Sequence, residues 1–192
     1  MNREDVYMLI PEHSLLENRK LREACADIWI EALEKCEWSG TGFLTKCPIA
    51  VVAVAPECPE DTITHTRRVA RLCKLLYEGL EDYFDEIGPC SYENLIASAL
   101  IHDVGKFWEY APCENGDWTY SKNGKMFRHP CTGAYLAQKY GLPETVVHAV
   151  LTHSFALSPE GAKAMNTPEA LILKYVDDMV FNYAKIFFPR KS

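Results

Sequence analysis

Apolar residues recur at steps of three and four along much of the chain, which is the spacing of one face of an α-helix. The first such stripe lies between Ser14 and about Trp38 and consists of Leu21, Cys25, Ile28, Ala32 and Cys36. Gly40 and Gly42 follow it, and glycine is a common residue at helix ends. This spacing predicts an amphipathic helix in the N-terminal region.

A second helix is predicted to begin at Asp61 or Thr62, both of which are good N-cap residues, and to run to about Phe84. Its inward stripe is expected to consist of Val69, Leu72, Leu76 and Leu80. His65 lies one helical turn before Val69 and therefore shares the inward face. We expect its imidazole to point toward the core.

Ser91 is the expected cap of a third helix, on which Leu95, Ala99 and His102 fall on one stripe. This places His102 at the inner C-terminal end of that helix. The next residue, Asp103, follows directly at the helix end.

Two shorter helices are predicted next, one from His129 with Pro130 in its first turn and Gly141 at its end, and one from Pro143 that carries His153 on the face of Val146 and Val150. The sequence Thr167-Pro168-Glu169 predicts the start of a final helix, with an inward stripe made of Leu173, Asp177, Val180 and Ala184.

Two segments are not helical by these criteria. The apolar run 49–55 predicts a short strand or a buried extended segment, and 108–127 predicts a polar loop with a small hairpin, because Asn-Gly pairs flank the strand-forming residues 118–120. The expected fold is an all-α helical bundle with a loop or hairpin insertion after His102-Asp103. We predict one structural domain, with an N-terminal helix and connecting segment in 1–60 packed on a main unit in 61–192.

Composition limits the function. The chain has 192 residues, 48% apolar and 24% charged, and no apolar run approaches the roughly 18 residues of a membrane span. Acidic residues and a proline interrupt the apolar stretch at the N-terminus. This favours a cytoplasmic protein over one with a signal peptide. Its eight cysteines form no CxxC pair, so we expect reduced thiols, and a net charge of −7 argues against binding of long nucleic acid.

Five of the predicted helices bring a histidine or an aspartate to an inward position or a helix end. Such groups are costly to bury unless they are paired or bind a metal. A mixed imidazole and carboxylate set suits iron, manganese, cobalt, nickel or zinc better than calcium or magnesium. The pattern therefore predicts a divalent transition-metal site.

The order of these residues closely resembles the HD phosphohydrolase superfamily over roughly 61–184. The matching phrases are LIHDVGKF, HPCTGAYLA, LTHS and YVDDMV. The resemblance implies a basic metal site made of His65, His102, Asp103 and Asp177. It also implies an extra pair, His129 and His153, which is found in members that hold two metal ions.

Further roles follow for individual residues. Asp103 has two carboxylate oxygens and is the expected bridging ligand, and Lys106 is the expected catalytic cation beside it. Lys106 is also an expected contact for substrate phosphate. Weaker candidates are Arg67, Arg68, Lys125 and Arg128, of which Arg67 and Arg128 are preferred, and His65-Thr66-Arg67 matches a phrase often seen in the superfamily. A possible aromatic wall over a nucleobase consists of Trp108, Trp118, Tyr120 and Phe127. On the last helix Asp177 is preferred to Asp178 as the ligand, and His13 and His148 are expected at the surface.

The function predicted from these residues is a metal-dependent phosphohydrolase acting on a small, nucleotide-like phosphoester or phosphoanhydride. One alternative is an oxygenase, because inositol and phosphonate oxygenases resemble this scaffold and use the same ligand types for a di-iron centre. Another is a nucleotide-binding sensor without catalysis. A homodimer is possible, and the role of residues 1–60 is left open.

Overall fold

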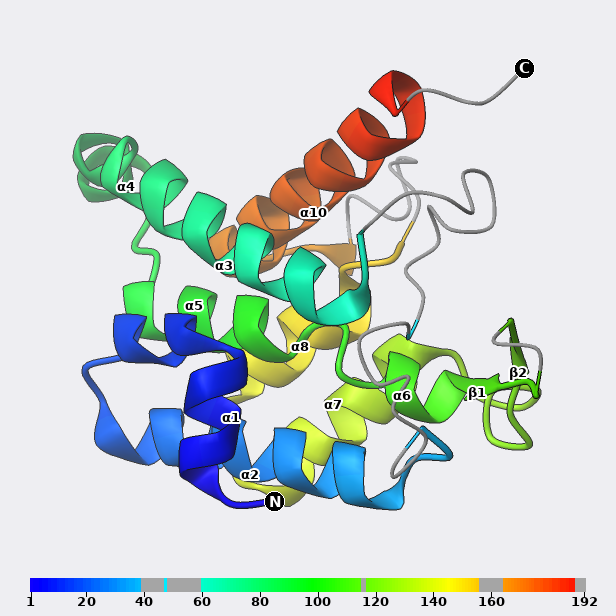
Figure 1. The fold of residues 1–192 in the computed structure, drawn as a ribbon. Coiled ribbons are helices and arrows are strands. Elements are labelled where there is room, and N and C mark those ends of the chain that lie inside the picture. Colours follow the sequence, from blue (N-terminus) through cyan, green and yellow to red (C-terminus); the bar gives the residue numbers. More distant parts are fainter. Residues whose placement is uncertain (39–46, 48–59, 115–116, 156–163, 189–192) are drawn as a thin grey trace.

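The computed structural model describes residues 1–38, 47, 60–114, 117–155 and 164–188. Over these residues the fold is all-α with one small antiparallel sheet, as predicted (Figure 1). The elements are α1 (Arg3–Leu9), the 3₁₀ helix η1 (Pro11–Leu15), α2 (Arg19–Lys35), α3 (Thr62–Glu78), α4 (Glu81–Ile87), α5 (Tyr92–Ile101), α6 (Lys106–Glu109), β1 (Tyr110–Pro112), β2 (Trp118–Tyr120), α7 (His129–Lys139), α8 (Glu144–Thr152) and α10 (Pro168–Phe187).

Helix α5 is the centre of the bundle. The Ser91 side chain caps it by accepting a hydrogen bond from the Asn94 backbone N–H, as the sequence predicts. All of the residues 95–101 are buried, which is typical of a helix enclosed on every side. In Figure 1, α2 lies below α5, and α3 and α10 lie above it. The C-terminal end of α5 therefore lies in the middle of the molecule.

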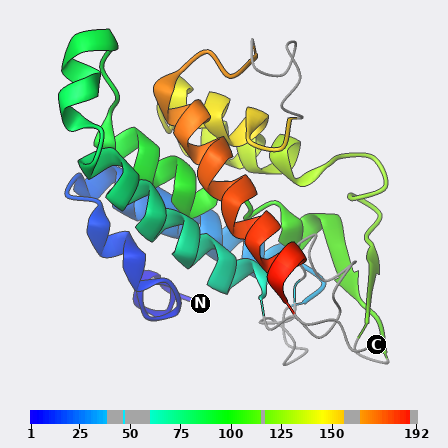
Figure 2. The same cartoon turned by 90° about the horizontal axis from the view of Figure 1, so that it is seen from above.

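Helices α3 and α10 pack against each other and against α5 (Figure 2). Asp61 caps α3 by accepting from the backbone N–H groups of Ile63 and Thr64, and Thr167 caps α10 by accepting from that of Ala170. Both caps were predicted. They fix the helix starts and hence which side chains face α5.

The N-terminal region differs from the prediction. One long helix over 14–38 was expected, but α2 begins only at Arg19, where Asn18 provides the cap, and α1 and η1 precede it. Helix α2 packs on the bundle through Trp29, which is buried, donates to the Leu100 carbonyl over 2.8 Å and contacts the Phe107 ring. The prediction missed α1 because seven residues are too few to show a clear helical stripe.

The second predicted helix was also too long. It ends at Glu78, and Gly79 separates it from the short α4, since glycine is a poor helix former. Leu76, expected in the core, is 38% exposed because this end of α3 extends beyond the packed part of the bundle. The predicted hairpin is present, with Tyr110 paired to Tyr120 and Pro112 to Trp118. The run 49–55 lies outside the described residues.

The surface prediction for two histidines was wrong. His13 is 1% exposed, because η1 folds back and its ring packs on Tyr7 while Nδ1 donates to the Ile10 carbonyl. His148 is half-buried, with its Nε2 atom inaccessible. Among the described residues, free thiols are found at Cys25, Cys47, Cys73, Cys90, Cys113 and Cys131. Within the same residues, no helix combines the length and the apolarity that crossing a membrane requires.

Candidate metal centre

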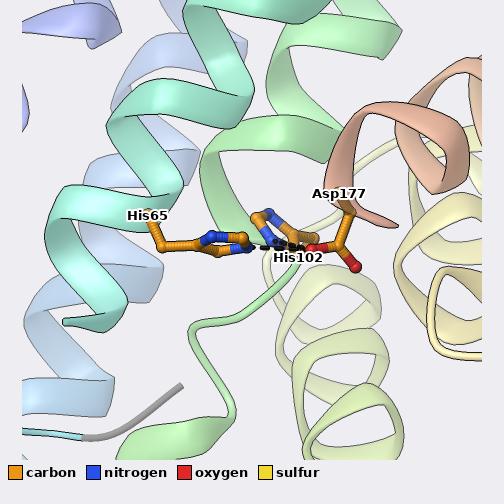
Figure 3. Close-up of side chains that lie close together, drawn as sticks. All are labelled: His65, His102 and Asp177. Atoms are coloured by element: carbon orange, nitrogen blue, oxygen red, sulfur yellow. Dashed lines mark hydrogen bonds and ion pairs between the residues drawn. The ribbon is translucent and has the colours of Figure 1, made fainter. Parts of the chain in front are cut away.

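The first group of predicted ligands consists of His65, His102 and Asp177, which we call triad A. They come from α3, the C-terminal end of α5, and α10 (Figure 3). The Nε2 atom of His65 lies 2.9 Å from Oδ1 of Asp177, and Nε2 of His102 lies 3.9 Å from the same oxygen. One ligand atom from each residue lies within 4.8 Å of the others, so a single ion could contact all three.

The second group, triad B, consists of Asp103, His129 and His153, all buried. His129 is the first residue of α7 and His153 follows the last residue of α8. Their Nε2 atoms lie 3.3 and 3.5 Å from Oδ1 of Asp103 and 3.2 Å from each other. The structure therefore brings together all six residues that the sequence singled out.

Asp103 joins the two triads. Its Oδ1 faces the histidines of triad B, whereas Oδ2 lies 3.6 Å from Nε2 of His65 and 3.5 Å from Nε2 of His102 in triad A. Each carboxylate oxygen is thus directed at a different set of imidazoles. This is the arrangement of a carboxylate that can contribute one oxygen to each of two ions.

The ring orientations of His102 and His153 direct Nε2 toward the other candidate ligands. Nδ1 of His102 lies 2.8 Å from the Ala99 carbonyl, and Nδ1 of His153 lies 2.7 Å from the Val150 carbonyl. A carbonyl oxygen only accepts hydrogen bonds, so in both rings Nδ1 carries the proton. In the neutral form of each ring, the Nε2 lone pair therefore points into the cluster.

The donor set fits a divalent transition metal. Nε2 of His102 and Oδ1 of Asp103 are buried without a hydrogen-bond partner, which is costly unless another group satisfies them. Imidazole nitrogen together with carboxylate oxygen is the combination preferred by borderline first-row metals. Triad A and triad B could each hold one such ion.

The local charges favour positive charge in the cluster. Burial acts to raise the pKa of Asp103, but the Lys106 ammonium and His102 outweigh it and hold that pKa well below its usual range. Burial acts to lower the pKa of His102, whereas Asp103 and Asp177 raise it, with a net increase. Two ionised carboxylates thus attract a proton or a cation to this position.

His129 is held neutral. Burial lowers its pKa to about 4, and this effect exceeds the opposite influence of the Glu109 carboxylate. A neutral imidazole is the form that binds metals. Near neutral pH, His129 therefore presents the Nε2 lone pair to the other residues of triad B.

A family model for the HD domain matches residues 62–180, more than half of the chain. The chain belongs to the HD domain family. Its members are mostly metal-dependent hydrolases that bind divalent metals. No curated protein and no solved structure matched the chain.

The HD domain has a small cavity over its two triads. Its volume is about 190 Å³, and its lining includes His65, Asp103, His129 and Asp177 of the triads together with Lys106, Tyr110, Arg128, Ser154, Lys174, Asp178 and Phe181. Two larger cavities, of about 510 and 540 Å³, are lined by none of the six predicted ligands. Four of the six candidate ligands therefore line the smaller cavity.

Of the predicted substrate contacts, Lys106 and Arg128 line this cavity. Lys106 is buried and donates to Oδ2 of Asp103 over 2.6 Å. Arg67 is not among the lining residues, because its guanidinium binds Glu12 of η1. Lys174, which sequence reasoning missed, lies at the cavity and binds Asp178. Asp178 is therefore an ion-pair partner, and Asp177 is the residue in triad A.

The predicted aromatic residues lie elsewhere. Trp108 donates to the Ala32 carbonyl of α2, and Trp118 and Tyr120 of β2 pack around Tyr110. The aromatic residues at the cavity are instead Tyr110 and Phe181. Only the position of the hairpin relative to the bundle could have identified Tyr110.

Glu109 is the main site residue that the sequence did not indicate. It lies at the end of α6, is fully buried, and accepts hydrogen bonds from His129 and Arg128. It falls on no apolar stripe, so its spacing carries no signal. The only hint was its place shortly after the HD motif.

Proposed function

We propose that this HD domain is a metal-dependent phosphohydrolase acting on a small phosphorylated substrate, with nucleotide-like phosphoesters as the expected class. The observation that carries the proposal is the position of Asp103 between the two histidine groups, at the floor of a cavity that also presents cationic side chains. A two-ion site of this kind is typical of enzymes that hydrolyse phosphoesters.

The ions would be held by His65, His102 and Asp177 on one side and by His129 and His153 on the other, with Asp103 common to both. When bound, divalent ions would supply the Lewis acidity that activates water and offsets charge on a phosphoryl group. Lys106 is proposed to keep Asp103 ionised and oriented, through the 2.6 Å hydrogen bond between them. It is also a proposed electrostatic contact for the substrate.

Substrate binding is assigned to the cations at the cavity. Arg128 uses its Nε–H to bind Glu109, and a guanidinium has five N–H donors in all, so others are available for phosphate oxygens. Lys174 is proposed as a second contact from α10. Both are paired with a carboxylate, which keeps each cation in place before the substrate arrives.

The size of the cavity limits what it can enclose. Its volume of about 190 Å³ is below the roughly 300–1,000 Å³ of pockets that enclose drug-sized ligands. Among the described residues it therefore suits a phosphoryl group and its nearest atoms. The rest of a nucleotide would extend past Tyr110 and Phe181, which offer aromatic surface at the cavity.

The test is a hydrolysis panel with the full chain. The protein is stripped of metal, reloaded separately with manganese, iron, cobalt, nickel or zinc, and assayed against phosphomonoesters, cyclic and linear phosphodiesters, nucleotides and polyphosphates. We expect phosphate or nucleoside release with at least one ion, and none without metal. Asp27→Asn is a control for the loss of a carboxylate outside the cavity. It should hydrolyse substrate as wild type does, because Asp27 lies on α2 and pairs with Arg3.

Two outcomes would contradict the proposal. Oxygen consumption by the iron-loaded protein with a small phosphonate or polyol, without phosphoester hydrolysis, would indicate an oxygenase. Tight nucleotide binding without turnover under every metal condition would indicate a sensor.

A further inference from the structure

Glu109 is a buried carboxylate surrounded by donors. Its Oε2 lies 2.5 Å from Nδ1 of His129 and accepts from the His129 backbone N–H over 2.9 Å, while Oε1 accepts from Nε of Arg128 over 2.6 Å. Its side chain is 0% exposed. A buried charge of this kind is costly, so these three donors are what keep it there.

The contact with Nδ1 fixes the state of the His129 ring. An ionised carboxylate accepts hydrogen bonds only, so Nδ1 of His129 must carry the proton and Nε2 of the neutral ring must present its lone pair. That Nε2 lies 3.3 Å from Oδ1 of Asp103 and 3.2 Å from Nε2 of His153. Two other rings of the triads, those of His102 and His153, have Nδ1 fixed by backbone carbonyls instead.

The hairpin and the turn after it hold Glu109 in place. The Ser121 backbone N–H donates to the Glu109 carbonyl over 3.0 Å, and Gly124 packs so closely that an added Cβ would lie 1.9 Å from that oxygen. Glu109 is therefore fixed at both its backbone and its carboxylate. The hairpin and turn that follow the HD motif therefore contact Glu109, which is hydrogen-bonded to His129 of triad B.

We propose that Glu109 is a positioning residue that orients His129 for the ion of triad B. Carboxylates that accept from the second nitrogen of a ligating imidazole fix the ring and raise its basicity, and their removal typically weakens metal binding. The same carboxylate holds Arg128, so it links a metal ligand to a proposed phosphate contact. The inference rests on the proposed metal-dependent function, but its test measures metal binding and ring state and does not measure hydrolysis.

Replacing Glu109 with glutamine should disrupt its hydrogen bonds although the side chain keeps its size. All three partners of Glu109 are donors, and a glutamine amide would direct its own NH₂ donors at one of them. The matched control is Glu31→Gln, because Glu31 is also buried and also accepts from three side chains, those of Lys35, Lys139 and Tyr140. It lies outside the two triads and the cavity.

The experiment measures manganese stoichiometry and affinity by metal analysis and calorimetry on the full-length chain. We expect Glu109→Gln to lower the affinity for the ion of triad B by ~10- to 100-fold and to retain the other ion. Glu31→Gln should bind both ions with the affinity of wild type. In a His129→Ala background, Glu109→Gln should cause no further loss. An unchanged affinity for the second ion in Glu109→Gln, or an equal loss of affinity for the ion of triad A, would overturn the inference.

A second measurement needs no variant at position 109. Nitrogen-15 NMR of the metal-free wild-type protein at neutral pH should show His129 with its proton on Nδ1, assigned by loss of the signals in His129→Ala. A proton on Nε2 would overturn the inference, as would a wild-type protein that binds one ion unaffected by His129→Ala. If metal binding changes as expected but no phosphoester is hydrolysed, the proposed function fails and the role of Glu109 stands.

Discussion

Triad A and triad B are built on different parts of their helices. In triad A, His65 and Asp177 lie within α3 and α10 and reach His102 at the end of α5. In triad B every residue lies at or beyond a helix end, and His129 depends on a carboxylate from the insertion. The first triad is positioned by helix packing, whereas the second is positioned by helix termini and hydrogen bonds.

This difference predicts that one residue should affect both triads and most others only one. Asp103 is the shared residue, and Asp103→Asn removes the charge that faces four imidazoles. We expect both ions to be lost. This effect is larger than the ~10- to 100-fold decrease in metal affinity that follows removal of a residue that only supports a ligand. Metal analysis and the hydrolysis assay measure it. Retention of two ions in Asp103→Asn would mean that the carboxylate is not shared.

A second substitution separates the triads. Asp177→Asn should remove the ion of triad A and leave that of triad B, because Asp177 has its close contacts with His65 and His102. His129→Ala should do the reverse. The matched control is Asp178→Asn, since Asp178 binds Lys174 and is in neither triad, and its metal content should equal that of wild type. Equal metal losses in Asp177→Asn and Asp178→Asn would contradict the assignment.

A third substitution tests the dependence of triad B on helix termini. A Cβ at Gly105 would lie 2.2 Å from the His129 carbonyl oxygen, so Gly105→Ala must displace the start of α7. We expect a loss of about 1–3 kcal/mol in the free energy of unfolding, as for other overpacked sites, and weaker binding at triad B alone. Urea denaturation and calorimetry measure these effects. In Gly79→Ala, where the nearest atom would lie 3.5 Å away, neither should occur.

The smallest effect on the triads is expected at the far end of α7. Burial acts to raise the pKa of Glu31, but hydrogen bonds from Lys139, Lys35 and Tyr140 lower it to about 2. Because this folded-state pKa lies below the ordinary value of 4.5, the stabilisation is complete above about pH 4.5 and is lost as the pH falls toward 2. Glu31→Gln should lower the free energy of unfolding at pH 7 by about 1–3 kcal/mol.

Denaturation of wild type and Glu31→Gln between pH 2 and 7 measures this contribution, and the gap between the two proteins should narrow as the pH falls. A gap that is constant over that range would show that the Glu31 charge contributes nothing. Metal content should be the same in both proteins at pH 7, since Glu31 lies at the opposite end of α7 from His129.

The contrast between the triads also explains what the sequence could predict. His65, His102 and Asp177 lie on apolar stripes, so helical periodicity alone places them inward. His129 begins a helix and has no stripe, and its place rested on the family resemblance. Glu109 could not be predicted, because its role depends on a hairpin and turn that fold back over its backbone.

The same reason accounts for Arg67. It was favoured as a phosphate contact because His65-Thr66-Arg67 matches a phrase often seen in the superfamily, but the sequence did not reveal η1. That element brings Glu12 to the guanidinium, with Nε of Arg67 donating to a carboxylate oxygen over 3.0 Å. The caps at Asp61, Ser91 and Thr167 were predictable because a capping side chain acts on backbone groups two or three residues away.

The adjacency of His102 and Asp103 has a consequence for the motion of the site. His102 belongs to triad A and Asp103 is shared by both triads, so one planar peptide unit, which resists rotation, links the two triads through the backbone. Thermal motion of α3 and α10 would change the distances between ligand atoms in triad A, and thermal motion of α7 and α8 would change those in triad B. The link between the two triads is in this sense covalent, and it would persist even while the surrounding helices move.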